Sequence, residues 1–527
     1  MNKWLFLAFL SFYLLTASCR IDSGDGEAMY QVTDSMLNGR GFVISDTAPT
    51  QDFLGSRGER IPREVLGGSG YGAYGVDGRY YAKYGPGQSF AAIPFYLIGR
   101  LAYWIRPGWS EAFWTRTSVV LLNAVVTALT VVLVIETAQL FFDRSTSLAV
   151  AVLFGLATPA WPYAKSFFSE PLLGATMLLS GYAAMRARRE VNTRWWLMSG
   201  AALGAAALVK LTALIIVPAV VSYLSAVRRP FKWLAWLGPL AFAIALEALY
   251  NVVRFGNPLT SGYSSLLRWD TPVWVGIYGL LLGPGKGLIW FTPLIALSIV
   301  ALPTFLRRSQ TKAEGWLIVG ATGLFIGLHS VYDSWAGGGS WGPRLIIPTV
   351  AWLILPVGLI LERRLRSRWQ ELGLAIMIAA SVMVQVLGIS VSYARHLQAV
   401  YDASQSSEEY FDRTQFSWPD SPITGQVREL RAVTSNLRRA DSRQQLRAMV
   451  ERTLSAPLPR DPSYDARTEA VGLLAFNVPD VWFVYGWLMG VPPLQMGILV
   501  ALLIAVLIVS FWRLGAALEL YRPSPAR

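Results

Sequence analysis

Acidic side chains are concentrated near the start of the chain, where Asp22, Asp25 and Glu27 fall within six positions. They follow an apolar run, from Trp4 to about Ala17, that is a candidate membrane helix. Acids at the end of such a helix meet water, so they are available for proton transfer without carrying charge into lipid. The alternative is that they only solvate the helix end. Two intervening glycines allow a tight turn, and this spacing favours a catalytic site.

Further charged residues recur between later apolar runs. The substrate-binding candidates are Lys83, Tyr84, Lys165, Glu170, Lys286, Asp333 and Arg344. The membrane topology that the basic clusters favour places the charged members of this set on the same membrane face as the three acids. Acids beside lysines and an arginine suit a reaction on a phosphate-linked lipid. A base removes a proton from an acceptor hydroxyl, while cations stabilise the departing phosphate. Arginine binds phosphate bidentately and lysine acts as a point charge.

Several candidates have structural alternatives. Lys83 precedes Tyr-Gly-Pro-Gly, a sequence equally typical of a solvated turn. Lys286 lies in a Gly-Pro-Gly-Lys-Gly segment that lacks the spacing of a nucleotide-binding loop, although it can present a lysine to a lipid phosphate. Glu170 can cap a helix start, which favours acids. His329, at the end of an apolar helix, is interpreted as structural.

The composition indicates the kind of scaffold that carries these residues. Of 527 residues, 54% are hydrophobic and only 15% are charged. Soluble domains carry about 25% charged residues, so we predict a polytopic, all-helical membrane protein. The net charge of +13 comes largely from basic clusters in short connectors between apolar runs. This basicity therefore sets membrane topology and does not indicate nucleic-acid binding.

Twelve apolar runs are long enough to be considered spans, several of them near the lower limit of about 17 residues. They lie near 4–19, 117–141, 146–164, 170–187, 195–211, 212–227, 232–253, 288–306, 315–332, 344–361, 371–392 and 489–512. The run 88–105 is ambiguous. If it lies on the membrane surface, the later basic clusters and Lys3 share one side, as the positive-inside tendency requires. We therefore predict a surface helix for 88–105.

This topology places four long segments outside: 20–116, 254–287, 333–343 and 393–488. The first is rich in glycine and tyrosine. Within the last, 426–454 has helical spacing of apolar residues and is predicted to pack against the membrane part. The predicted domains are a catalytic membrane domain over 1–392, the outer segment 393–488, and a last helix with a cytoplasmic tail over 489–527.

The chain has few cysteine and histidine residues that could form disulfides or bind a metal. A single cysteine, Cys19, precludes an intramolecular disulfide, and only two histidines accompany it. This set does not support a closed zinc site. The outer acids are numerous enough to bind Mg²⁺ or Mn²⁺, but their spacing specifies no site and no cofactor is predicted with certainty.

The order of these motifs resembles a known family. A short first helix ending in acids, a long first outer loop with surface helices, and an acid opening the fourth helix look like the GT-C membrane glycosyltransferases. This group includes the protein O-mannosyltransferases and the lipid A aminoarabinose transferase, and the likeness is strongest to the bacterial phospholipid-carrier-dependent branch. The resemblance covers about residues 1–390. It implies that Asp25 is the general base, although Asp25 and Glu27 are split by Gly26 here, which leaves open which acid is catalytic. It also implies that Lys83 meets the donor phosphate and that Glu170 opens the fourth helix. Ser340–Arg344 matches a Gly-Pro-Arg sequence frequent in that branch.

The resulting hypothesis is an inverting glycosyltransferase of the bacterial inner membrane, acting on the extracytoplasmic side. Its expected partners are a polyprenyl-phosphate sugar donor, membrane lipids, and a glycan, lipid or protein acceptor, with no nucleic acid. Two other interpretations remain. A transporter or flippase for lipid-linked sugars would use the same charges for binding, and an O-antigen ligase or polymerase would transfer a glycan chain.

Overall fold

The computed structural model describes residues 1–44, 71–190, 192–227, 229, 231–263, 268–363, 367–456 and 465–519. Parts of the first outer loop and the tail 520–527 lie outside these ranges, as do the first residues of its glycine- and tyrosine-rich run, 67–70. The described residues are mostly helical, and the sheet among them has two strands.

The chain begins with α1 (Asn2–Leu15) and α2 (Gly24–Leu37). Ser23 caps α2, because its hydroxyl accepts a hydrogen bond from the Gly26 amide at 3.0 Å. Asp25 and Glu27 follow in the first turn, where the helix dipole favours carboxylates. The predicted acidic segment is therefore the start of a helix.

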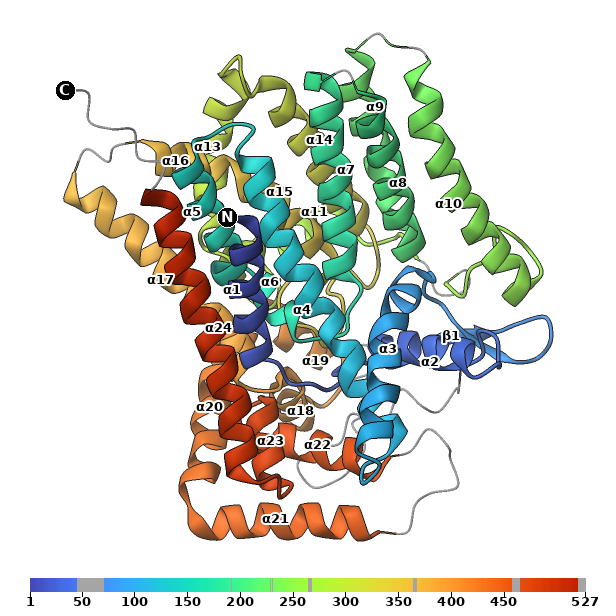
Figure 1. The fold of residues 1–527 in the computed structure, drawn as a ribbon, viewed down its shortest axis with the longest axis vertical. Helices are drawn as coiled ribbons and strands as arrows, with labels where there is room; N and C mark the ends of the chain where they lie inside the picture. Colours follow the sequence, from blue (N-terminus) through green and yellow to red (C-terminus); the bar gives the residue numbers. More distant parts are fainter. Residues whose placement is uncertain are drawn as a thin grey trace.

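A small hairpin and a long helix complete the segment that is predicted to be the first outer loop. Strands β1 (Gly72–Tyr74) and β2 (Tyr80–Ala82) pair antiparallel, with Gly72 opposite Ala82. Helix α3 (Gly87–Ile105) follows and corresponds to the predicted surface helix. It lies beside α2 in Figure 1 and is not among the described helices that qualify as membrane spans by length and composition.

The central part of the chain forms most of the helical bundle. Its first half contains α4 (Glu111–Ala138), α5 (Arg144–Ala157), α6 (Ala160–Ala164), α7 (Glu170–Glu190), α8 (Thr193–Val209), the 3₁₀ helix η2 (Leu211–Ile216), α9 (Val217–Ser225) and α10 (Lys232–Phe255). Its second half contains α11 (Val273–Leu281), α12 (Leu288–Phe291), α13 (Ile295–Arg307), α14 (Lys312–Ser330), η3 (Arg344–Thr349), α15 (Val350–Leu353), η4 (Leu355–Val357), α16 (Gly358–Glu362) and α17 (Arg368–Ser390).

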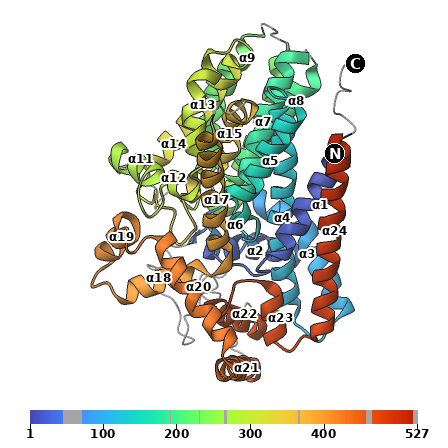
Figure 2. The same ribbon diagram turned by 90° about the vertical axis from the view of Figure 1, so that its left-hand side faces the viewer.

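The C-terminal part gathers at one end of the bundle. It contains α18 (Tyr393–Asp402), α19 (Ser407–Phe416), α20 (Pro422–Arg438), α21 (Ala440–Ser455), α22 (Ala466–Asn477), α23 (Trp482–Leu488) and α24 (Pro493–Glu519). The predicted helical element 426–454 consists of two helices, α20 and α21. Figure 2 shows α18 and α19 beside the lower part of the bundle and α21 to α23 at its lower end, and both figures show α24 returning along α1.

Among the described residues, five helices are long and apolar enough to cross a membrane, or six if the bent pair α22 and α23 is one span. The five are Glu111–Ala138, Lys232–Phe255, Arg344–Glu362, Arg368–Ser390 and Pro493–Ala517. The predicted count of twelve is not confirmed. Several apolar runs form shorter or interrupted helices, because α8 ends at Val209 and Pro293 separates α12 from α13. Helices α12 and α13 are each shorter than the roughly 17 residues of a full span.

Candidate functional site

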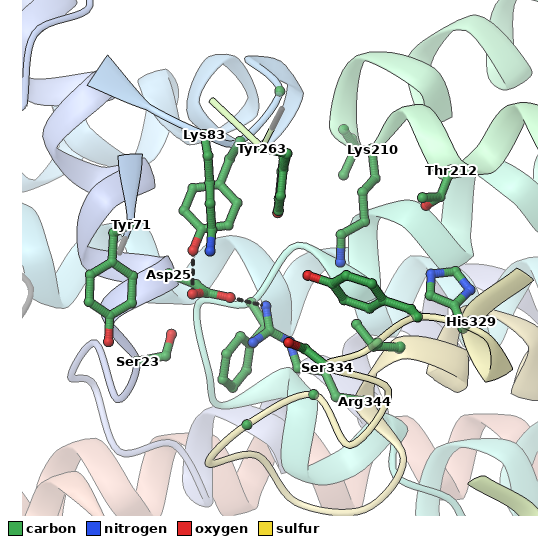
Figure 3. Close-up of a pocket in the computed structure, with 18 of the residues that line it drawn as sticks. Ser23, Asp25, Tyr71, Lys83, Lys210, Thr212, Tyr263, His329, Ser334 and Arg344 are labelled. Carbon is green, nitrogen blue, oxygen red and sulfur yellow. Dashed lines mark hydrogen bonds and ion pairs between the residues drawn. The ribbon is translucent and has the colours of Figure 1, made fainter. Parts of the chain in front are cut away.

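A cavity of about 210 Å³ lies where the start of α2, the segment after β2, the end of α8 and the loop before η3 meet. Its lining includes Asp22, Asp25, Lys83, Tyr84, Lys210, Thr212, Glu247, Tyr263, His329, Tyr332 and Arg344. Figure 3 shows the Asp25 carboxylate between the side chains of Lys83 and Arg344. The structure therefore brings several of the predicted site residues together, from segments far apart in the chain.

Asp25 is held by two partners, one on each carboxylate oxygen. The Tyr84 hydroxyl donates to Oδ1, and Nη2 of Arg344 pairs with Oδ2. Burial favours the neutral carboxyl and raises its pKa. The charges of Arg344 and Lys83 and the hydrogen bond from Tyr84 outweigh that effect and lower the pKa of Asp25 to about 2. Asp25 is therefore an ionised carboxylate at neutral pH in the free protein.

Arg344 connects Asp25 to a second acid. Its Nε donates to Oε1 of Glu170 at 2.9 Å, and Nζ of Lys210 donates to the same oxygen at 2.9 Å. The Glu170 side chain is fully buried. The guanidinium also lies 4.1 Å from the centroid of the Phe168 ring. Asp25, Arg344, Glu170 and Lys210 thus form a chain of alternating charges. Glu170 lies behind the cavity wall and fixes the arginine fork that lines it.

The turn before Arg344 depends on a glycine. Gly342 has a φ of +68°, in the left-handed region that other residues rarely adopt. Pro343 follows it, and η3 begins at Arg344. This local sequence explains why the Gly-Pro-Arg motif points its arginine back across the bundle toward α2.

Lys83 lies on the opposite side of Asp25 from Arg344 (Figure 3). Its ammonium is 5.1 Å from the centroid of the Tyr263 ring and 5.6 Å from that of Tyr84. Burial lowers the pKa of Lys83, and the neighbouring Asp25 carboxylate opposes that shift. Around Asp25 the cavity therefore presents two cations, Lys83 and Arg344, which suit an anionic group such as a phosphate.

Glu27 does not line this cavity. It is 1% exposed and accepts two hydrogen bonds from Arg116, at 2.7 Å and 3.1 Å. Gln31 donates to it as well, at 3.2 Å. A bidentate buried pair of this kind fixes α2 against α4. The structure thus separates Glu27 from Asp25, although the two residues share the first turn of one helix.

Lys165 belongs to a neighbouring cluster. Its Nζ lies 2.7 Å from Oδ2 of Asp480, and Nε of Arg20 lies 3.2 Å from Oδ1 of the same residue. Asp22 lines both this smaller cavity and the first one. Oδ1 of Asp22 is buried without a hydrogen-bond partner among the described residues. Burial raises the pKa of Asp22, and the Arg20 charge opposes this effect only in part. The pKa of Asp22 is therefore raised, whereas the pKa of Asp25 is lowered.

Two other predicted ligands do not line the cavity. Nζ of Lys286 donates to the backbone oxygens of Gly338, at 3.0 Å, and of Ser340. It therefore supports the glycine loop that leads to Arg344, and burial lowers its pKa to about 7. The backbone amide of Asp333 donates to the Arg268 carbonyl at 3.1 Å. Oδ1 of Asp333 is buried and has no hydrogen-bond partner among the described residues.

The sequence reasoning did not select Lys210, Tyr263 or Asp480 as site residues. Lys210 had a signal, since it interrupts an apolar stretch from 195 to 227 and charged residues inside membrane helices usually have a function. Tyr263 and Asp480 had none, because their contacts with Lys83 and Lys165 depend on tertiary structure. No group of three or more His, Cys, Asp or Glu residues within the described ranges could hold a metal ion.

Comparison with known proteins gives a family match. Residues 112–250, about a quarter of the 527-residue chain, match the dolichyl-phosphate-mannose-protein mannosyltransferase family. The match includes Lys165, Glu170, Lys210 and Glu247 and ends before Arg344. No curated protein sequence matches the chain.

Solved structures give weaker likenesses. ArnT from Cupriavidus metallidurans bound to undecaprenyl phosphate shares 13% identity over 90% of this chain and 84% of that chain, with a TM-score of 0.49. The oligosaccharyltransferase of Archaeoglobus fulgidus in the apo form shares 11% identity over 94% of this chain and 65% of that chain, with a TM-score of 0.44. The family match over 112–250 confirms, for that segment, the predicted resemblance to the GT-C membrane glycosyltransferases.

Proposed function

We propose that the protein transfers a sugar from a polyprenyl-phosphate donor to an acceptor hydroxyl, at the membrane face where the cavity lies. The observation that carries the proposal is the contact of Asp25 with Arg344 and Tyr84 beside Lys83, in one cavity bordered by membrane helices. A carboxylate and two cations are the groups that this reaction requires. The family match over 112–250 supports the same reaction class.

In the proposed reaction Asp25 accepts the proton of the acceptor hydroxyl. The acceptor oxygen attacks the anomeric carbon from the face opposite the phosphate, and the bond between that carbon and the phosphate oxygen breaks. The phosphate leaves with the bonding electrons, and Lys83 and Arg344 stabilise its charge. Attack from the opposite face inverts the anomeric configuration.

Donor binding also changes Asp25 in this scheme. In the free protein Arg344 keeps the pKa of Asp25 at about 2, and such a carboxylate is a weak base. A bound phosphate competes for the guanidinium and for Lys83, which reduces their stabilisation of the Asp25 charge. The base therefore becomes stronger when the donor is in place. Asp22 is the alternative base, because burial raises its pKa and its Oδ1 has no hydrogen-bond partner among the described residues.

The test is transfer of labelled sugar from a panel of polyprenyl-phosphate sugars by the purified protein, beside Asp25→Asn. The matched control is Asp34→Asn, on the same helix but paired with Arg40. We expect transfer by the wild type and the control, and a loss of about 10²–10⁴-fold in Asp25→Asn. Unchanged turnover in Asp25→Asn would remove Asp25 as the base. The lipid from which sugar is transferred identifies the donor sugar.

A transporter for lipid-linked sugars is the second candidate. Lys210, at the end of α8, and Glu247, within the α10 span, both line the cavity. Charged side chains inside membrane segments commonly mark transport pathways. Reconstitution in vesicles separates the two functions, because translocation of the lipid without glycoside formation would support the transporter. An O-antigen ligase or polymerase would instead show transfer of a whole glycan chain in product analysis.

A further inference from the structure

Two polar side chains in the membrane-side part of the cavity have no assigned partner. Glu247 lies in α10 and Thr212 lies in η2, and both line the cavity that contains Asp25 and Lys83. Glu247 is only 4% exposed. Its Oε2 and the Oγ1 of Thr212 are buried, and neither atom has a hydrogen-bond partner among the residues that the structure describes.

Packing between α8 and α10 explains why Glu247 faces the cavity. A Cβ atom on Gly204 would lie 2.7 Å from Cβ of Ala243, so the two helices are in close contact at that level. Residue 247 is one helical turn further along the same face of α10. Helix α8 ends at Val209, and the chain continues into η2. The end of α8 thus leaves room where Glu247 points, and Thr212 borders the same space.

Arg254, the cationic residue nearest to Glu247 in the sequence, makes no hydrogen bond to it. Arg254 lies two turns further along α10, and its guanidinium donates to the carbonyls of Ala82 and Tyr250 and to Oδ1 of Asn251. A carboxylate and a hydroxyl buried without partners are costly to the folded state. Their arrangement is therefore better explained by a ligand that supplies hydrogen-bond donors than by stability.

We propose that Glu247 and Thr212 bind the sugar of the lipid-linked donor through a hydroxyl or ammonium group, and so determine which donor is accepted. This inference rests on the proposed function. The polyprenyl chain has no polar atoms, and the phosphate offers acceptor oxygens and negative charge, which a carboxylate repels. The sugar is the part of the donor that carries O–H or N–H groups. With the phosphate at Lys83 and Arg344, the sugar extends within the same cavity toward α10.

Binding measurements on bare and sugar-linked lipids test this subsite. The probes are polyprenyl phosphate, a polyprenyl-phosphate hexose and a polyprenyl-phosphate aminohexose, titrated by native mass spectrometry. Glu247→Leu and Thr212→Val remove the hydrogen-bond acceptors, and Thr212→Ser is the matched control that keeps the hydroxyl. We expect Glu247→Leu to weaken binding of a sugar-linked lipid about 10- to 100-fold, as a lost hydrogen bond to a charged group does. Affinity for bare polyprenyl phosphate stays unchanged.

Glu247→Gln distinguishes a sugar hydroxyl from a sugar ammonium group as the hydrogen-bond donor to residue 247. A hydroxyl still donates to the amide oxygen, so a neutral sugar keeps most of its affinity, whereas an ammonium loses its counter-charge. Equal losses for bare and sugar-linked lipids would overturn the proposal, and so would wild-type affinity of Glu247→Leu and Thr212→Val for every probe. Because binding is measured without turnover, a wild type that transfers no sugar refutes the proposed function while this comparison still decides the subsite.

Discussion

Arg344 and Asp25 form an ion pair although they lie 319 positions apart in the chain. The same guanidinium binds Glu170 at the start of α7. One side chain thus joins α2, α7 and the loop after α14. The pair also has a chemical consequence, since it lowers the pKa of Asp25 and so keeps this carboxylate a weak base.

Arg344→Lys is expected to lower kcat/KM for transfer about 10- to 100-fold. A single ammonium cannot reproduce the planar fork that binds Asp25 and Glu170 together, and each charge-assisted hydrogen bond contributes about 1.5–3 kcal/mol. The matched control is Arg308→Lys, in a half-exposed pair with Glu362. Exposed pairs contribute at most about 1 kcal/mol, so this variant should behave as wild type. Equal activity of Arg344→Lys and wild type would contradict the role of the fork.

Lys83→Met is expected to weaken binding of bare polyprenyl phosphate about tenfold, because it removes a cation but keeps much of the side-chain volume. Lys3→Met is the control, since Lys3 lies at the exposed start of α1, outside the cavity. Fluorescence or native mass spectrometry titration of the lipid gives the two affinities. An unchanged affinity in Lys83→Met would show that the phosphate binds elsewhere.

The acidic part of the site could be predicted because its cause is local. Three acids follow an apolar run in the sequence, and the structure shows them around the start of α2, which Ser23 caps. Their separation could not be predicted. Arg116 draws Glu27 toward α4, while Arg344 binds Asp25, and neither arginine is near these acids in the chain.

The helical class and most long helices also followed from the apolar pattern, but the number of spans did not. Hydropathy does not show that helix α8 ends at Val209, or that the side chain of the next residue, Lys210, pairs with Glu170. It also does not show that Lys286 binds backbone carbonyls of the glycine loop. Both outcomes depend on which distant groups surround a lysine after folding, and that information is absent from local composition.

The pH dependence of kcat/KM distinguishes the two possible bases, because it reports the free enzyme. A base must be deprotonated, so activity falls as pH drops below its pKa. The pKa of Asp25 is lowered to about 2. With Asp25 as base, kcat/KM stays level as pH falls from neutral through the usual carboxylate range. With Asp22, whose pKa is raised by burial, the decline begins at a higher pH than for an ordinary aspartate. Asp22→Asn should leave the profile unchanged in the first case and abolish transfer in the second.

Asp480→Asn is expected to destabilise the folded protein by about 3–5 kcal/mol, the usual effect of removing one partner from a buried ion pair. Asp480 lies between α22 and α23 and is the shared counter-charge of Arg20 and Lys165, which stay buried when it is neutralised. Thermal unfolding of the purified protein in detergent measures the change, with the exposed Asp402→Asn as control. If the variant and the control unfold at the same temperature, the cluster does not hold the C-terminal helices to the bundle. A lower unfolding temperature, partly restored in Asp480→Leu combined with Lys165→Met, would show that the unpaired buried charge is the cause.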